Sequence, residues 1–270
     1  MNPILNHSRV TAAGAQPSQW MLVLHGIYGA GRNWGTIARR LVDARPEWGV
    51  LLVDLRLHGG SKGFGGPHTL AASAADVDLL VDELGFHAAA VMGHSFGGKV
   101  ALMYAQHHAG GLKQVWVMDS TPAVREPSGS AWEMIEAVRS LPPEFATRTE
   151  GVEALIAQGY PEGLAQWMTM NLEPHEGRYR WRLDFGAMEE MLRDFFRTDL
   201  FGVVESPPPG VELHFVKATE SHTLDDEAAA RVEAAGRANG RVHLHFVEGG
   251  HWLNTDNPEA VLKLLVENLP

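Results

Sequence analysis

Short apolar runs alternate along this chain with longer segments of helical periodicity, and this alternation constrains the fold more than any other feature. The apolar runs cover residues 20–24, 49–55, 88–92, 114–118, 211–216 and 241–247. Runs of this kind are typical of strands buried on both faces, and helices between them are typical of a parallel sheet. The chain therefore predicts an α/β fold with a mostly parallel central sheet and helices on both faces.

Two of the intervening segments carry clear helix signals. Residues 69–84 repeat leucine and valine at helical spacing, and Gly85 follows as a residue that tolerates the left-handed C-cap conformation. Near the end of the chain, Asn257 and Pro258 are typical of an N-cap and a first helical position, so a helix is expected over 258–269. We expect both helices to cover the sheet.

The alternation is interrupted between Asp119 and Pro207, where the sequence shows no convincing strand pattern. Ser130 followed by Glu133 has the spacing of a capping box, and apolar residues recur at helical spacing over 185–195. We therefore predict a core built from residues 1–120 and 206–270, with residues 121–205 forming a helical cap or lid.

Methionine and tryptophan side chains are concentrated in this predicted lid. They either form the lid's own core or line an apolar substrate pocket, and both uses are compatible on opposite faces of the same helices. We expect Trp132, Trp167 and Met191 from the lid, together with Trp252 near the C-terminus, to contact substrate. The substrate is then expected to be apolar near its reacting carbonyl.

The pentapeptide Gly93-His94-Ser95-Phe96-Gly97 lies between the run 88–92 and a helical pattern over 99–107. A strand-to-helix turn exposes a nucleophilic serine, and its tight geometry requires residues without bulk at both glycines. Ser95 is therefore the predicted nucleophile. The Phe96 N–H begins a helix and is free to bind a developing oxyanion, whereas His94 is expected to pack or hydrogen-bond beside the turn.

Two further loops complete the predicted site. The loop after run 20–24 should supply a second backbone donor to the oxyanion, for which Ile27 is the candidate, while His25 is expected to order that loop. His251 follows the last apolar run in a Gly-Gly-His-Trp sequence. Because ligands bind at the carboxyl ends of the strands in open α/β sheets, His251 is the predicted general base.

Two acidic residues follow predicted strands and are candidates for the acid that would orient His251. Glu220 lies in the loop after run 211–216, where many proteins of this kind carry the acid. Asp119 ends run 114–118, beside the strand that carries Ser95, and its alternative use is as a turn residue before Ser-Thr-Pro. Asp119 is the predicted acid.

Charge and composition exclude several classes of function. A formal net charge of −11 works against nucleic acid or an anionic membrane as the main partner. The chain has no cysteine, and its other histidines form no HExxH pattern, so no metal site is predicted. No signal peptide or membrane span is visible, and a cytoplasmic location is expected. The sequence gives no indication of oligomeric state.

The strings LHGIYGAGRNWGTIARRL, DLRLHGGS, GHSFGGKVALMYA, VMDSTPA and GGHWLNTDNPEAV resemble the α/β-hydrolase superfamily. Within it, the similarity is to bacterial esterases and acyl-thioesterases related to the abhydrolase-domain-11 proteins. The resemblance implies a Ser–Asp–His triad with Asp119 as acid, two backbone oxyanion donors, no cofactor, and activity on short to medium acyl esters or thioesters. It also implies structural roles for Asp54, Arg56 and His58.

Other activities are compatible with the same residues. A cofactor-free haloperoxidase or a carbon–carbon bond hydrolase could use the same triad, and a hydrolase-fold protein could bind ligands with little turnover. An aspartate-nucleophile mechanism is excluded because position 95 is serine.

Overall fold

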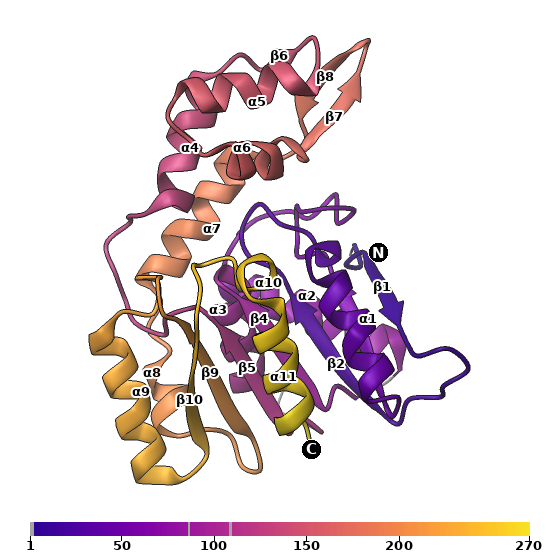
Figure 1. Cartoon of the computed structure of the whole chain (residues 1–270), viewed down its shortest axis with the longest axis vertical. Helices are drawn as coiled ribbons and strands as arrows, with labels where there is room; N and C mark the ends of the chain where they lie inside the picture. Colours follow the sequence, from indigo (N-terminus) through magenta and orange to yellow (C-terminus); the bar gives the residue numbers. More distant parts are fainter. Residues whose placement is uncertain (1–2, 86, 108–109) are drawn as a thin grey trace.

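A seven-stranded sheet forms the centre of the protein (Figure 1). The computed structural model describes residues 3–85, 87–107 and 110–270. The strand order is β1-β3-β2-β4-β5-β9-β10, and all neighbours except β1 and β3 are parallel. The strands are β1 (His7–Val10), β2 (Gln19–Leu24), β3 (Trp48–Val53), β4 (Ala90–His94), β5 (Gln114–Met118), β9 (Glu212–Ala218) and β10 (Val242–Val247). All six predicted strands are confirmed, and the short antiparallel edge strand β1 is additional.

Helices cover both faces of the sheet, as predicted. One face is covered by α1 and α11, and the other by α2, α3 and α9 (Figure 1). The helices of the core are α1 (Gly35–Ala44), α2 (Leu70–Leu84), α3 (Phe96–His107), α9 (Asp226–Asn239), α10 (Leu253–Asp256) and α11 (Pro258–Asn268), with a 3₁₀ turn η1 (Gly31–Trp34) before α1.

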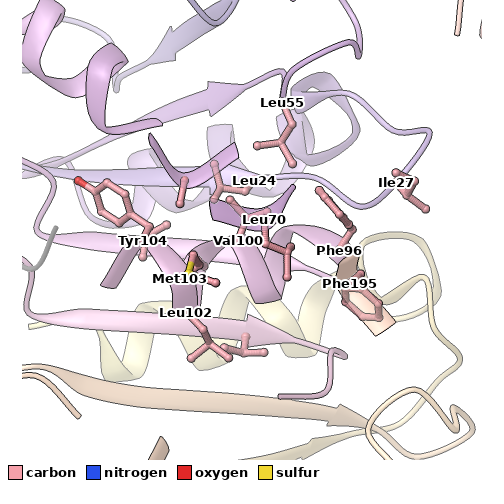
Figure 2. Packing of buried hydrophobic residues seen from close by; sticks show 14 of the residues in the cluster. Leu24, Ile27, Leu55, Leu70, Phe96, Val100, Leu102, Met103, Tyr104 and Phe195 are labelled. Carbon is pink, nitrogen blue, oxygen red and sulfur yellow. The ribbon is translucent and has the colours of Figure 1, made fainter. Parts of the chain in front are cut away.

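Alternate residues of each strand supply the two buried cores. On β2, Met21 and Val23 pack toward α1 and α11, whereas Leu22 and Leu24 pack toward α2 and α3. This separation follows from the strand's period of two. Figure 2 shows Leu24, Leu70 and Val100 meeting in the core beneath α2 and α3. The strands are therefore apolar on both faces, which explains their continuous hydrophobic pattern.

The helix signals read from the sequence are confirmed at their ends. Gly85 ends α2 with a left-handed φ of 66°, and Asn257 caps α11 by accepting a hydrogen bond from the Ala260 N–H, with Pro258 at the first position. The capping box predicted at Ser130 is wrong, because Ser130 lies inside α4 and Gly129 is the N-cap, with φ 86° and no side-chain cap.

Most of the segment between β5 and β9 lies over one end of the sheet, whereas its last helix, α8, lies beside α9 (Figure 1). Its helices are α4 (Ser130–Ser140), α5 (Arg148–Ala157), α6 (Glu162–Thr169), α7 (Phe185–Arg197) and α8 (Phe201–Glu205). It also contains an antiparallel sheet of β6 (Glu144–Phe145), β7 (Leu172–His175) and β8 (Arg178–Trp181). The segment predicted as a helical cap or lid is thus built mainly of helices, with a small antiparallel sheet that the sequence pattern did not indicate. Glu176 and Gly177 both have positive φ, as a two-residue hairpin turn requires.

Lys99 of α3 joins this segment to the core. Its buried ammonium donates hydrogen bonds to the carbonyls of Ala123, Phe195 and Thr198, at 2.6 to 2.8 Å. These carbonyls lie at the two ends of the segment that carries α4 to α7. Within the described part of the chain, no helix combines the length and apolar character needed to cross a membrane.

Candidate active site

Ser95 stands on a tight turn between β4 and α3, with φ 53°. Both glycines beside it are required sterically. A Cβ at Gly93 would lie 1.9 Å from the Gly97 carbonyl oxygen, and one at Gly97 would lie 2.5 Å from the carbonyl oxygens of Leu24 and His25. The glycine spacing therefore follows from the close approach of strand, turn and helix, and it leaves the Ser95 side chain facing a cavity.

His251 and Asp119 meet above the carboxyl ends of the strands. The Nδ1 atom of His251 lies 2.6 Å from Oδ2 of Asp119, whose other oxygen accepts the Ala218 N–H. Because an ionised carboxylate only accepts hydrogen bonds, the proton of a neutral His251 is on Nδ1. This assignment leaves the Nε2 lone pair available to take a proton.

Asp119 is fully buried and keeps its charge through local hydrogen bonds. Burial alone would raise the pKa of its carboxyl, but hydrogen bonds from His251, Ser221 and the Ala218 N–H lower that pKa below the usual range. A buried carboxylate stabilised in this way is ionised at neutral pH. It is thus able to stabilise positive charge on His251.

His94 supports His251 from the opposite side. Its Nε2–H donates to the His251 carbonyl at 2.8 Å, and the two ring centroids are 4.7 Å apart. Burial, with the neighbouring His251, lowers the pKa of His94 to about 3, so the ring is neutral. His94 therefore hydrogen-bonds beside the turn, as expected from the sequence.

The loop that carries Ile27 is fixed by a second group of buried histidines. The Nε2 of His25 accepts the Leu55 N–H, and the Nε2 of His58 accepts the Tyr28 N–H, both at 3.0 Å. Asp54 accepts the N–H groups of Gly31 and Gly60.

Arg56, which follows β3, joins its loop to α2 through a bidentate ion pair with Asp76. These contacts are structural, which agrees with the expectations for His25, Asp54, Arg56 and His58.

Two backbone N–H groups belong to residues that line the cavity beside Ser95. The N–H groups of Ile27 and Phe96 have no acceptor among the described residues, and both residues line the same cavity as Ser95. Phe96 is the first residue of α3, where the helix leaves its N–H groups unpaired and its dipole favours negative charge. The arrangement can accommodate an oxyanion.

The cavity has a volume of about 390 Å³ and lies between the sheet edge and the segment above it. Ser95 and His251 lie on its core side. Its other wall is apolar and comes from α4, α6 and α7, through Met134, Leu164, Trp167, Leu192, Phe195 and Phe196. Phe96 and Phe195, which both line the cavity, lie next to each other (Figure 2).

Comparison with known proteins identifies the family to which this chain belongs. The sequence profile described as "Alpha/beta hydrolase family" matches residues 21–264. The chain belongs to the alpha/beta hydrolase family. The sn-1-specific diacylglycerol lipase ABHD11 of Xenopus tropicalis is 27% identical over 259 residues, covering 92% of this chain and 77% of that protein.

Two further proteins resemble this alpha/beta hydrolase over nearly its whole length. Lipase LipV of Mycobacterium tuberculosis is 25% identical over 260 residues, covering 92% of both chains. The solved structure of a marine microorganism esterase superposes with a TM-score of 0.86 at 25% identity, covering 99% of this chain and 100% of that one. The esterase group named from the sequence is therefore the right part of the superfamily.

Not every predicted site residue of this alpha/beta hydrolase reaches the cavity. Trp167 and Trp252 line it, with ring centroids 4.5 Å apart. Met191 is fully buried in the core, and Trp132 packs against Phe196 and Arg193, so neither is part of the cavity wall. These two predicted substrate contacts therefore lie outside the cavity wall, whereas Leu192 and Phe195 of α7 belong to it.

The alternative acid, Glu220, lies at the mouth of the cavity and is exposed. Its N–H donates to the Gly249 carbonyl, and Asp119 is the carboxylate hydrogen-bonded to His251.

The sequence analysis missed Tyr28. The Tyr28 hydroxyl donates to the Ala131 carbonyl, and its own carbonyl accepts from Asn171, so it links the Ile27 loop to the segment above. Its left-handed φ of 63° in a non-glycine residue gives no sequence signal.

Proposed function

We propose that this protein is a serine esterase that cleaves carboxylic esters or acyl thioesters with Ser95 as nucleophile, His251 as general base and Asp119 as the acid that orients it. The observation that carries the proposal is the 2.6 Å contact between His251 Nδ1 and Asp119, formed at the wall of the cavity that holds Ser95. A carboxylate that fixes the histidine tautomer beside a serine on a strand-to-helix turn is the arrangement of acyl-transfer catalysis.

The reaction proceeds in two steps. His251 Nε2 takes the Ser95 proton while the serine oxygen attacks the carbonyl carbon, and the N–H groups of Ile27 and Phe96 stabilise the oxyanion. His251 then gives its proton to the leaving alcohol or thiol. Water repeats the attack on the acyl-enzyme, again with His251 as base, which releases the acid and restores Ser95.

The cavity wall supports an apolar acyl group of short to medium length. On the side of α4, α6 and α7 its wall is formed by Trp, Phe, Leu and Met side chains, whereas polar residues such as Thr121, Arg125 and Thr223 line another part of it. Trp167 and Trp252 are the proposed substrate contacts nearest His251. The relatives named as lipases and an esterase support an ester substrate class.

A fluorophosphonate probe, combined with a panel of esters and acyl-CoA thioesters of graded chain length, tests the proposal. Labelling of wild type but not of Ser95→Ala, with turnover of at least one ester series, is the expected result. Tight binding of the esters without labelling or turnover would instead favour a binding protein. Labelling without turnover of any ester or thioester would show that Ser95 is activated but that the enzyme catalyses another reaction.

A further inference from the structure

Strands β9 and β10 lie at one edge of the sheet (Figure 1), and together they carry a cluster of polar side chains. Glu212 and His214 alternate on β9, and His243 and His245 alternate on β10, with His214 and His243 directly paired in register. Alternate residues of a strand face the same side, so the four side chains share one face of the sheet. Glu212 is the first residue of β9 and His243 is the second residue of β10, whereas Ser95 follows the end of β4, so the cluster lies at the opposite end of the sheet from the cavity.

The ligand atoms of three of these residues converge. One nitrogen each from His214 and His243 and one carboxylate oxygen of Glu212 all lie within 4.8 Å of one another. His214 Nε2 and Glu212 Oε2 are 3.6 Å apart, too far for a hydrogen bond. Ligands of a tetrahedral Zn²⁺ ion at about 2.0–2.1 Å would lie roughly 3.3 Å from each other, so small side-chain movements suffice.

His214 carries an unexplained polar atom. The residue is only 4% exposed, and its Nε2 has no hydrogen-bond partner among the described residues. A buried polar atom without a partner costs about 1–3 kcal/mol, and native structures rarely leave one without a reason. A metal ion between Nε2, the Glu212 carboxylate and His243 would satisfy it.

The surroundings hold the converging atoms as a metal site requires. His214 Nδ1 lies 3.1 Å from His245 Nε2, so a proton on Nδ1 leaves the Nε2 lone pair for a metal. The His214 ring stacks on Trp116 at 4.2 Å between centroids, and Gln114 Nε2 donates to Glu212. Metal-ligating histidines commonly donate their other nitrogen to a second group in this way.

We propose that Glu212, His214 and His243 bind a divalent transition-metal ion of the Zn²⁺ type, with the remaining coordination position open to solvent. Two imidazoles and one carboxylate are ligands that suit Zn²⁺ over Mg²⁺ or Ca²⁺. The site joins edge strand β10 to β9, far from Ser95, so it stabilises the sheet edge and takes no part in ester hydrolysis. This proposal departs from the sequence expectation of no metal site, because the ligands come from two strands and not from a helix motif.

Zinc titration of the full-length protein, followed by calorimetry and by the visible bands of substituted Co²⁺, tests the site. His243→Gln and Glu212→Gln each remove one ligand from a partly exposed position, so folding is retained. His175→Gln, which changes a histidine on β7 outside the cluster, is the matched control. Because loss of an outer partner alone costs about 10–100-fold in metal affinity, each ligand variant should bind Zn²⁺ at least about tenfold more weakly.

The expected result is one ion bound per chain by wild type and His175→Gln, with affinity lost in both ligand variants and ester hydrolysis unchanged in them without metal. Bound Zn²⁺ should also raise the melting temperature of wild type but not of His243→Gln. The proposal is overturned if wild type binds no Zn²⁺, or if both ligand variants bind it as tightly as wild type. Zinc that binds all forms alike and inhibits hydrolysis would place the ion on His251 and also overturn it.

Discussion

Asp119 Oδ2 lies 2.6 Å from Nδ1 of His251, although 132 residues separate the two in sequence. The contact forms because β5 and β10 both end at the same edge of the sheet, with β9 between them. Asp119 adopts a left-handed φ of 43° at the end of its strand, which turns the chain over the sheet. The contact depends on the whole sheet being assembled, and its chemistry can be tested residue by residue.

Asp119→Asn should lower kcat by about a thousandfold or more while leaving the fold intact, because an amide no longer fixes the His251 tautomer or stabilises its charge. Glu220→Gln is the matched control and should have a mild effect, since Glu220 is exposed and is not the partner of His251. Steady-state kinetics with one ester measure both variants. The opposite order of effects would assign the acid to Glu220.

His94 should act as a positioning residue for His251. His94→Leu removes the Nε2–H donor to the His251 carbonyl and should lower kcat about tenfold with KM little changed, the cost of roughly one hydrogen bond. His94→Gln retains a donor and should recover part of the loss. If both variants show the same change in KM and the same loss of stability, the role of His94 is packing alone.

Trp167 and Met191 should respond differently to truncation. Trp167→Ala removes a large side chain from the cavity wall and so enlarges the cavity. It should change the preferred acyl chain length more than turnover of an acetate ester. Met191→Ala leaves a hole in the core and should cost about 2–5 kcal/mol of unfolding free energy with chain preference retained. A chain-length panel and urea unfolding separate the two. Unchanged selectivity in Trp167→Ala would remove Trp167 from the substrate pocket.

Stability should fall as the pH is lowered below neutrality because His58 is buried and neutral. Burial lowers the pKa of His58 from 6.5 to about 3. Between these values the unfolded chain binds the proton and the folded chain does not, so acid favours unfolding, by at most about 1.4 kcal/mol per pH unit for this residue.

Urea unfolding at about pH 7 and about pH 5 measures the slope. His58→Gln, which retains an acceptor for the Tyr28 N–H, should show a smaller loss of stability between the two. An identical slope in the variant would mean that His58 is protonated in the folded protein.

The sheet and the turn at Ser95 could be predicted because their causes are local. Continuous apolar runs mark strands buried on both faces. Gly93 and Gly97 are required because a Cβ atom at either position would lie only 1.9 to 2.5 Å from a backbone oxygen. Position along the chain, however, left Glu220 beside Asp119 as an alternative. Only the assembled sheet shows which carboxylate contacts His251.

The cavity wall and the small hairpin were harder to predict. β7 and β8 are four residues each, and β8 alternates exposed with half-buried residues, so neither resembles the apolar strands of the core. On α7, helical spacing identifies which residues share a face but not which face meets the cavity. Met191 is fully buried in the core, although Leu192 and Phe195 beside it on the helix line the cavity.

The central claim is that Ser95 is the nucleophile, and it is tested most directly by comparing wild type with Ser95→Ala. The turn accepts alanine sterically, so the variant should fold and melt like wild type but lose the attacking oxygen. We expect hydrolysis of a short-chain ester to fall by about a thousandfold or more, with no fluorophosphonate labelling. A Ser95→Ala rate within about tenfold of wild type would contradict the account.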